Sequence, residues 1–418
     1  MDTFVINGGK KLTGTAEVYS AKNSVLALLA ASILTEESVT IHKCPAITDV
    51  FNMLKILESL GCKIQWQGDS VTIDSQHASV HEIPAHYAKE IRSSIFMLGS
   101  ILGRFKRAKA VFPGGCEIGL RPIDLHLKGL RMLGVEVREF GGYIECDASR
   151  AKGSEIHFDF PSVGATENIM LAAVLAEGNT TLTNAAREPE IVALEHFLNA
   201  MGADVSGAGT STIHIRGVAK LHGVEFLPIP DRIVAGTYLI AAAITGGEME
   251  ITNVRPADLE ALISKLDGNA CDIKNYSDRM IVKGYRRPVG AQLVETSPYP
   301  GFPTDLQAQM MALQTISDGI CVIEENMFET RFKHVPELMK MGANIIVRDR
   351  IAIVRGVERL YGADVRASDL RGGAGLVLAA LCAEGTTTIS NVRQIDRGYV
   401  RLDEVLSRLG ADIRRVNR

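Results

Sequence analysis

The residues with the greatest potential for chemistry lie in a glycine-rich segment, residues 112–126, which reads FPGGCEIGLRPIDLH. Glycines at positions 114, 115 and 119 surround a single cysteine, Cys116. Glycines let a loop hinge and let its backbone approach a ligand closely. Arg121 and the basic run at residues 103–107 lie nearby in the sequence, and cations beside a thiol favour its reactive thiolate form. We therefore predict that Cys116 is a reactive thiol, although a small apolar cysteine in a glycine-rich turn is the simpler alternative.

Basic residues recur at the starts of predicted helices that are rich in small apolar residues. Lys22 is followed by Asn23 at one such start, and Arg92, Arg232 and Arg371 stand at three others. The N-terminus of a helix attracts anions through its free N–H groups and its dipole, and an added cation strengthens the attraction. Each of these residues alone could be a solvated surface charge. Their recurrence at equivalent positions favours an anion-binding cleft between two halves of the molecule.

Asp305 is an acid at the position where the other helix starts carry basic or polar residues, within YPGFPTDLQ at residues 299–307. Acids at helix starts are usually N-terminal caps, which is a serious alternative. A carboxylate that faces an anion-binding cleft is also what a general base requires. Arg331 and Arg397 follow predicted strands, and each alone could be either a ligand contact or an exposed charge.

The elements that must position these residues repeat along the chain. One short motif, an apolar residue followed by a glycine and a strand-like run, recurs at Leu60, Leu133, Met201, Met341 and Leu409. A degenerate copy stands at residues 270–273. The interval is about 70 residues, so six units account for the whole chain. Each unit reads as a buried small-residue helix, a strand, an amphipathic helix ending at a glycine, and two short strands. The small-residue helices are predicted at residues 21–34, 165–176, 234–245 and 373–383.

The sixth unit lacks its last strand, and a segment of the same type stands at the N-terminus, where residues 4–8 read FVING. We predict that this N-terminal strand completes unit six. The chain then forms two lobes of three units each. The first lobe is residues 21–229, and the second is residues 1–20 together with residues 230–418. The chain crosses between them near residues 20 and 230, where the prolines of LPIPD fit a stiff connection.

Composition and charge exclude several classes of protein. The 418 residues carry a net charge of −4, whereas nucleic-acid-binding proteins are normally basic. No apolar run approaches the ~20 residues that span a bilayer, so we expect no membrane insertion. The N-terminal segment MDTFVINGG is no secretory signal, which favours a cytoplasmic location. Seven scattered cysteines without a C-x-x-C pair exclude a disulfide framework and a zinc ribbon, and we expect no metal site.

Six segments are distinctive as a set: AKNS at residues 21–24, PGGCEIGLRPIDLH at 113–126, SVGAT at 162–166, YPGFPTDLQ at 299–307, RFKH at 331–334 and DRGY at 396–399. In this order, and over nearly the full length of the chain, they closely resemble the UDP-N-acetylglucosamine 1-carboxyvinyltransferase family of enolpyruvyl transferases. The resemblance implies an α/β fold, a two-lobed inverse α/β barrel of six repeats with three in each lobe.

The resemblance also implies a reaction. The enolpyruvyl group of phosphoenolpyruvate is transferred to the 3-hydroxyl of UDP-N-acetylglucosamine and phosphate is released, in the first committed step of peptidoglycan synthesis. Both substrates are anionic, which fits a site with several fixed cations. By resemblance, Cys116 donates a proton to the methylene carbon and can attach covalently to the neighbouring carbon, while Asp305 takes the proton of the sugar hydroxyl.

The resemblance assigns the binding residues as well. The phosphate and carboxylate of phosphoenolpyruvate are held by Lys22, Arg121 and Arg397, with charge added by Arg331 and Arg371. The residues at positions that contact the sugar nucleotide are Asn23, Arg92, Arg121, Pro122, Ile123, Asp124, Leu125, Ser162, Val163, Gly164, Asp305 and Met327. Neither a metal nor a redox cofactor nor an obligate protein partner is implied. Substrate binding is expected to close the two lobes, with the loop at residues 114–119 acting as a lid. Cys116 is expected to be alkylated by fosfomycin.

Two departures from the family pattern bear on the site. Glu117 places a negative charge beside the thiol, which would raise the pKa of Cys116. Gly372 and Gly373 would loosen the start of the helix that carries Arg371.

Two other functions remain open. One is that of 5-enolpyruvylshikimate-3-phosphate synthase, whose motif does not use a glycine-flanked cysteine. The other is that of a catalytically weak paralogue, which binds the sugar nucleotide and regulates wall synthesis through partners. The presence of Cys116 and Asp305 argues against the second without excluding it.

Overall fold

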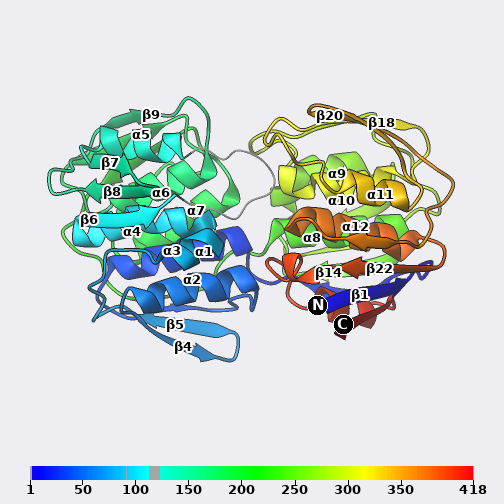
Figure 1. The fold of residues 1–418 in the computed structure, drawn as a ribbon, viewed down its shortest axis with the longest axis horizontal. Coiled ribbons are helices and arrows are strands. Elements are labelled where there is room, and N and C mark those ends of the chain that lie inside the picture. Colours follow the sequence, from blue (N-terminus) through cyan, green and yellow to red (C-terminus); the bar gives the residue numbers. More distant parts are fainter. Residues whose placement is uncertain (1, 91, 113–122, 418) are drawn as a thin grey trace. The chain divides into compact units, whose positions relative to one another are not determined.

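The computed structural model describes residues 2–90, 92–112 and 123–417, without the side chains of residues 89, 90, 92 and 93. In this part of the chain the strands form six small sheets, and the chain forms two compact units (Figure 1). The C-terminal unit contains residues 2–19 and 230–417, and the N-terminal unit contains residues 20–112 and 123–229.

The sheets share one plan, which reflects the repetition of one structural unit. In the sheet of β17 (Leu293–Glu295), β18 (Ile320–Glu324), β20 (Ile351–Arg355) and β19 (Asn344–Arg348), the first pair of strands is parallel and the other two pairs are antiparallel. Four further sheets have the same order of pairing. In the sheet of β6 (Arg107–Val111), β8 (Tyr143–Asp147) and β7 (Glu136–Phe140), a single parallel bridge between Glu82 and Lys109 takes the place of the first strand.

The other sheets of the C-terminal unit are β2 (Thr13–Glu17) with β14 (Glu248–Thr252), β16 (Arg279–Gly284) and β15 (Cys271–Asn275), and β21 (Asp364–Arg366) with β22 (Thr386–Ser390), β1 (Asp2–Asn7) and β23 (Asp412–Asn417). Those of the N-terminal unit are β13 (Val224–Phe226) with β3 (Val39–Ile41), β5 (Ser70–Asp74) and β4 (Lys63–Gln67); β6 (Arg107–Val111) with β8 (Tyr143–Asp147) and β7 (Glu136–Phe140); and β9 (Glu155–His157) with β10 (Asn179–Thr183), β12 (Thr212–Arg216) and β11 (Asp204–Ser206).

The small-residue helices form the interior of each unit, as predicted. In the C-terminal unit α8 (Arg232–Thr245), α10 (Gln307–Gln314) and α12 (Leu370–Cys382) pack against one another (Figure 1). A Cβ atom at Gly375 would lie 2.7 Å from the carbonyl oxygen of Ala308, so only glycine permits the contact between α10 and α12. In the N-terminal unit α4 (Phe96–Phe105) packs against α1 (Lys22–Ala31) and α6 (Val163–Ala173).

The remaining helices, most of which are amphipathic, are α2 (Thr48–Ser59), α3 (Ala85–Glu90), α5 (Asp124–Met132), α7 (Pro189–Ala200), α9 (Glu260–Leu266), α11 (Val335–Lys340) and α13 (Leu402–Arg408). Single 3-10 turns are η1 (Ser32–Leu34), η2 (Arg92–Ile95), η3 (Pro256–Leu259), η4 (Thr304–Leu306) and η5 (Val392–Gln394). The glycines predicted to end five of the amphipathic helices all have positive φ, between 83° and 101°. No helix in the described ranges is both long and apolar enough to cross a membrane.

The N-terminal strand β1 lies between β22 and β23 and is antiparallel to both (Figure 1). Phe4 and Ile6 on this strand are completely buried in the core of the C-terminal unit. The guanidinium of Arg415 on β23 lies 4.9 Å from the centre of the Phe4 ring. The first residues of the chain are therefore part of the same core as its last residues.

We expect Phe4→Ala to lower the free energy of unfolding by about 3–5 kcal/mol, because it leaves a cavity in a core that packs both chain ends. Val5→Ala is the matched control, since Val5 is half-buried and faces the other side of β1. It should cost less than about 1 kcal/mol. Urea unfolding of both variants measures the difference, and equal losses would contradict the assignment of β1 to the core.

Candidate active site

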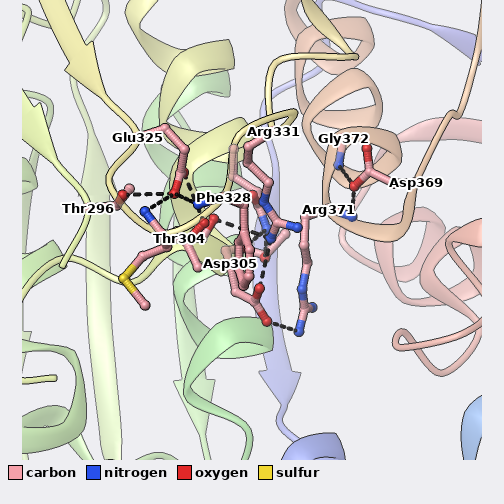
Figure 2. A network of polar contacts seen from close by, with 12 residues as sticks. Thr296, Thr304, Asp305, Glu325, Phe328, Arg331, Asp369, Arg371 and Gly372 are labelled. Atoms are coloured by element: carbon pink, nitrogen blue, oxygen red, sulfur yellow. Dashed lines mark hydrogen bonds and ion pairs between the residues drawn. The ribbon is translucent and has the colours of Figure 1, made fainter. Parts of the chain in front are cut away.

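Asp305 is held by two arginines from distant segments of the C-terminal unit. It lies on η4, directly before α10, and its side chain is 24% exposed. One carboxylate oxygen accepts a hydrogen bond from Arg331 at 2.7 Å, and the other accepts one from Arg371 at 2.8 Å (Figure 2). The N-cap position of α10 is occupied by Leu306. The carboxylate of Asp305 thus serves in a charged cluster, and the alternative that it is the helix cap is wrong.

Both arginines of this cluster are buried, each with a side chain only 4% exposed. Burial works to lower the pKa of Arg371, but the negative charge of Asp305 and the nearby Tyr399 and Asp231 outweigh it, so the pKa is raised and the group stays cationic. Arg331 Nε and Arg371 Nη1 are buried and have no hydrogen-bond partner among the described residues. Buried donors of this kind call for an explanation, and an anion that enters the cluster would supply their acceptors.

The backbone around Asp305 is fixed by a buried polar network. Gln309 Nε2 donates to the Asp305 carbonyl at 3.0 Å and to the hydroxyl of Tyr399 at 3.1 Å. The Tyr399 hydroxyl also lies 2.9 Å from Thr237 Oγ1 on α8. The ring of Tyr399 lies beneath Arg371, at 5.7 Å from the guanidinium carbon. Tyr399 therefore contacts Thr237 on α8, Gln309 on α10 and the guanidinium of Arg371. Through Gln309 it is also linked to the backbone of Asp305.

The start of α12 is firmer than its two glycines suggested. Asp369 caps the helix, because its carboxylate accepts hydrogen bonds from the N–H groups of Arg371 at 3.1 Å and Gly372 at 3.0 Å (Figure 2). A Cβ atom on Gly372 would lie 3.0 Å from His334 Cβ, and one on Gly373 would lie 2.7 Å from Ile395 Cγ1. The expected loosening is wrong, since the glycines allow close packing and the cap holds the first turn.

Arg397 lies in the turn after η5 and is half-buried. It donates to Gln394 Oε1 at 3.3 Å. The preceding residue, Asp396, accepts two hydrogen bonds from Arg415, at 2.6 and 3.0 Å. The strand β23 thereby anchors the turn that carries Arg397.

Lys22 is the first residue of α1 in the N-terminal unit and is buried. Its ammonium group lies 2.7 Å from Asp49 Oδ2, and the two side chains are 10% and 3% exposed. Asp49 belongs to the first turn of α2, so the packing of two helices sets the position of the ammonium group. Asn23 follows on α1 and is half-buried.

The other predicted contact residues occupy helix starts and loops. Ser162 caps α6 by accepting from the N–H of Ala165 at 3.3 Å, and Val163 and Gly164 form the half-buried first turn. Ile123 is buried at the start of α5. Asp124 is exposed and Leu125 is half-buried in the first turn of α5, and Met327 is half-buried in the loop after β18.

Several predicted residues lie outside the described part. Cys116, Glu117, Arg121 and Pro122 are among residues 113–122, and for Arg92 only the backbone is described, in η2. The six other cysteines are free thiols, and burial raises the pKa of each to about 12. None of the six is suited to supply a thiolate at neutral pH. In the described ranges, no three His, Cys, Asp or Glu side chains are grouped so as to hold a metal ion.

Three polar residues of these networks were not predicted from the sequence: Asp49, Gln309 and Tyr399. Asp49 is an acid in the first turn of a helix, a position at which solvated acids are common, so the sequence carries no signal of its burial. Asp369 was also missed, although an Asp directly before a helix of small residues is a recognisable capping signal.

The fold is shared with known enolpyruvyl transferases. The enolpyruvyl transferase NikO from Streptomyces tendae has a TM-score of 0.89 at 27% sequence identity, over 100% of this chain and 99% of that chain. EPSP synthase from Acinetobacter baumannii has a TM-score of 0.77 at 20% identity, over 100% of both chains. Residues 6–406 match the family described as EPSP synthase (3-phosphoshikimate 1-carboxyvinyltransferase). The class is that of the enolpyruvyl transferases, and the predicted two-lobed inverse α/β barrel is confirmed.

Relatives in sequence narrow the class. UDP-N-acetylglucosamine 1-carboxyvinyltransferase 2 of Caldanaerobacter subterraneus subsp. tengcongensis is 52% identical over 416 residues, covering 100% of both chains. UDP-N-acetylglucosamine 1-carboxyvinyltransferase of Geobacter metallireducens is 48% identical over 416 residues, again covering 100% of both chains. The chain belongs to the UDP-N-acetylglucosamine 1-carboxyvinyltransferase family.

We expect Asp49→Asn to lower the free energy of unfolding by about 3 kcal/mol, because it removes the charge that faces the buried ammonium group of Lys22. The matched control is Asp159→Asn, which breaks the ion pair with Lys128, at 2.6 Å but with side chains 71% and 39% exposed. Water screens that pair, so the control should show no measurable change in urea unfolding. A control that loses as much stability as Asp49→Asn would contradict the role given to burial.

A pH dependence of stability is expected from His334, which is fully buried near Asp369 and Arg331. Burial lowers its pKa below the usual 6.5, Asp369 opposes this shift and Arg331 reinforces it. The unfolded chain therefore binds a proton at a higher pH than the folded chain does. The stability due to the neutral ring is present above pH 6.5 and is lost as the pH falls below that value.

Urea unfolding between pH 7 and pH 5 measures this effect. The free energy of unfolding should fall more steeply with decreasing pH in the wild type than in His334→Gln. His214→Gln, at an exposed position on β12, is the control and should keep the wild-type slope. A wild-type slope in His334→Gln would contradict the assignment.

Proposed function

We propose that the protein transfers the enolpyruvyl group of phosphoenolpyruvate to the 3-hydroxyl of UDP-N-acetylglucosamine and releases phosphate. The observation that carries the proposal is the cluster of Asp305, Arg331 and Arg371, in which a partly exposed carboxylate stands beside two buried cations with unused donors. The names of the relatives, at 48% and 52% identity over the whole chain, supply the substrate.

Asp305 is the general base of this proposal. Its carboxylate lies beside two guanidinium groups, and its exposed fraction of 24% leaves it accessible to a sugar hydroxyl. The hydroxyl gives its proton to Asp305 as its oxygen bonds to the central carbon of phosphoenolpyruvate. The methylene carbon takes up a proton in the same addition. Loss of phosphate and of one proton from the resulting methyl group then restores the carbon–carbon double bond.

Fixed cations are proposed to bind the phosphate and carboxylate of phosphoenolpyruvate. Arg331 Nε and Arg371 Nη1 are buried donors that an anion can satisfy, and guanidinium groups bind such oxyanions through paired hydrogen bonds. Lys22, Arg121 and Arg397 complete the set by resemblance. An ammonium group already held by Asp49 loses little side-chain entropy on binding, which favours Lys22 as a ligand.

Cys116 is proposed as the acid that protonates the methylene carbon. The six other cysteines, with the pKa raised by burial, are unsuited to act in its place. Its own surroundings at residues 113–122 lie outside the described residues.

The sugar nucleotide is proposed to contact helix starts and one loop. Ser162, Val163 and Gly164 begin α6, where free N–H groups favour a diphosphate. Asn23 and Met327 are half-buried rather than enclosed in a core, which leaves them available to a ligand. The remaining contacts, at Arg92 and at residues 121–125, are carried over by resemblance.

We further propose that the two compact units are the two lobes, and that the protein works in the cytoplasm on these small molecules without an obligate protein partner or nucleic acid. The matched family includes 3-phosphoshikimate as an acceptor, so this second candidate is tested beside the first. The binding-only paralogue is the third outcome of the same test.

We expect phosphate release from phosphoenolpyruvate with UDP-N-acetylglucosamine as acceptor and none with shikimate-3-phosphate. Cys116→Ala and Asp305→Ala should each lower kcat by at least about 100-fold, the scale of a lost general acid or base. A coupled phosphate assay with both acceptors in parallel measures this. Release only with shikimate-3-phosphate would establish the second candidate, and sugar-nucleotide binding without any release would favour the regulatory paralogue.

A further inference from the structure

We propose that Glu325 is a positioning residue for this site, which sets the placement of Asp305 and of the loop at Met327 without touching substrate. This role rests on the proposed function. Glu325 directly follows β18, and its side chain is fully buried. Carboxylates are rarely buried in full unless they are paired. The donors that Glu325 uses in the described part of the chain are all neutral.

Four hydrogen bonds converge on this one carboxylate (Figure 2). Oε1 accepts from Thr296 Oγ1 at 3.0 Å, from the N–H of Met327 at 2.9 Å and from the N–H of Phe328 at 3.1 Å. Oε2 accepts from Thr304 Oγ1 at 2.9 Å. One buried side chain thus accepts hydrogen bonds from three separate segments, and each bond within this network restricts the segment that donates it.

One set of these bonds leads to the proposed base. Thr304 begins η4, and Asp305 is the next residue. Arg331 donates to the Thr304 carbonyl at 3.3 Å as well as to the Asp305 carboxylate. The hydroxyl of Thr304, held by Glu325, and its carbonyl, held by Arg331, together fix the peptide before the base. Displacements of about 1 Å can cost about 100-fold in rate, so such an anchor matters for proton transfer.

The other set leads to the loop proposed to contact the sugar nucleotide. Glu325 accepts from two successive backbone N–H groups, those of Met327 and Phe328, and Asn326 N–H donates to Thr296 Oγ1 at 2.9 Å. The ring of Phe328 lies 5.7 Å from the guanidinium carbon of Arg331 (Figure 2). The same carboxylate therefore sets the loop that supports Arg331 and carries Met327. We infer that Glu325 coordinates base placement with nucleotide binding.

The test compares four variants in the phosphate assay with UDP-N-acetylglucosamine. Glu325→Ala removes all four acceptors and should lower kcat at least about 30-fold and raise KM for the sugar nucleotide at least about 5-fold. Thr304→Val cuts only the connection to Asp305, so kcat should fall about 5-fold with KM unchanged. Glu325→Gln keeps an acceptor oxygen, and the Thr304 hydroxyl can rotate to accept from its amide, so most activity should return. Glu324→Ala, one residue earlier on the opposite face of β18, should behave as wild type.

A double variant tests whether Thr304 acts through Glu325. Thr304→Val should change kcat by less than about 2-fold when Glu325 is already Ala, because contacts within one network are not additive. Each variant is first compared with wild type in urea unfolding. If Glu325→Ala does not fold, the smaller Thr304→Val change and its split between kcat and KM decide the question.

Three results would overturn the role of Glu325 while wild-type turnover upholds the proposed function. These are equal kinetics for Glu325→Ala and Glu324→Ala, full additivity in the double variant, or a Glu325→Gln variant as impaired as Glu325→Ala. The last would mean that the charge, rather than the hydrogen-bond geometry, matters. A wild type that releases no phosphate with this acceptor refutes the proposed function itself, and it does so without reference to any variant.

Discussion

The burial of two guanidinium groups beside one carboxylate is the interaction on which the C-terminal site depends. Arg331 and Arg371 are almost fully desolvated, a state that costs several kcal/mol per ion unless charge and hydrogen bonds offset it. Asp305 provides the opposite charge, yet each arginine keeps one buried donor without a partner among the described residues. The negative charge of Asp305 thus offsets part of the cost of burying the two arginines, and the cluster still has donors available for an anion. Stability and anion binding follow from the same arrangement.

Repetition explains how these groups come together. The helices α8, α10 and α12 start at equivalent points of three repeats, and their small residues let them pack closely. Asp231 and Asp369 cap α8 and α12, while Arg371 and Asp305 stand at or before the first turns of α12 and α10. Residues at equivalent positions have diverged in charge. Repeated units can therefore form a site that is not itself repeated, in which the carboxylate of Asp305 contacts the guanidinium of Arg371.

Acids that are assigned no catalytic role recur beside the charged residues. Asp49 holds Lys22, Asp396 is held by Arg415 next to Arg397, and Glu325 binds the segments around Asp305. Asp49 and Glu325 are buried and lie on a different element from the residues they hold. Asp396 is partly exposed, and its pairing with Arg415 fixes the turn next to Arg397. A ligand-binding cation on a flexible side chain gains accuracy when such a partner restricts its rotamers.

The sequence alone determined the small-residue helices and the glycine-terminated amphipathic helices, because these depend on patterns within about 20 residues. It also determined the repeat, because one short phrase recurs at an interval of about 70 residues. The resemblance of its motifs to a known family implied that Asp305, Arg331 and Arg371 belong to one site. Local pattern could not decide whether Asp305 caps a helix or pairs with arginines, since its partners lie 26 and 66 residues away. Nor could it identify Glu325, whose surroundings are acidic and polar in sequence. Only the tertiary structure decided both, because burial and pairing depend on which distant segments are brought into contact.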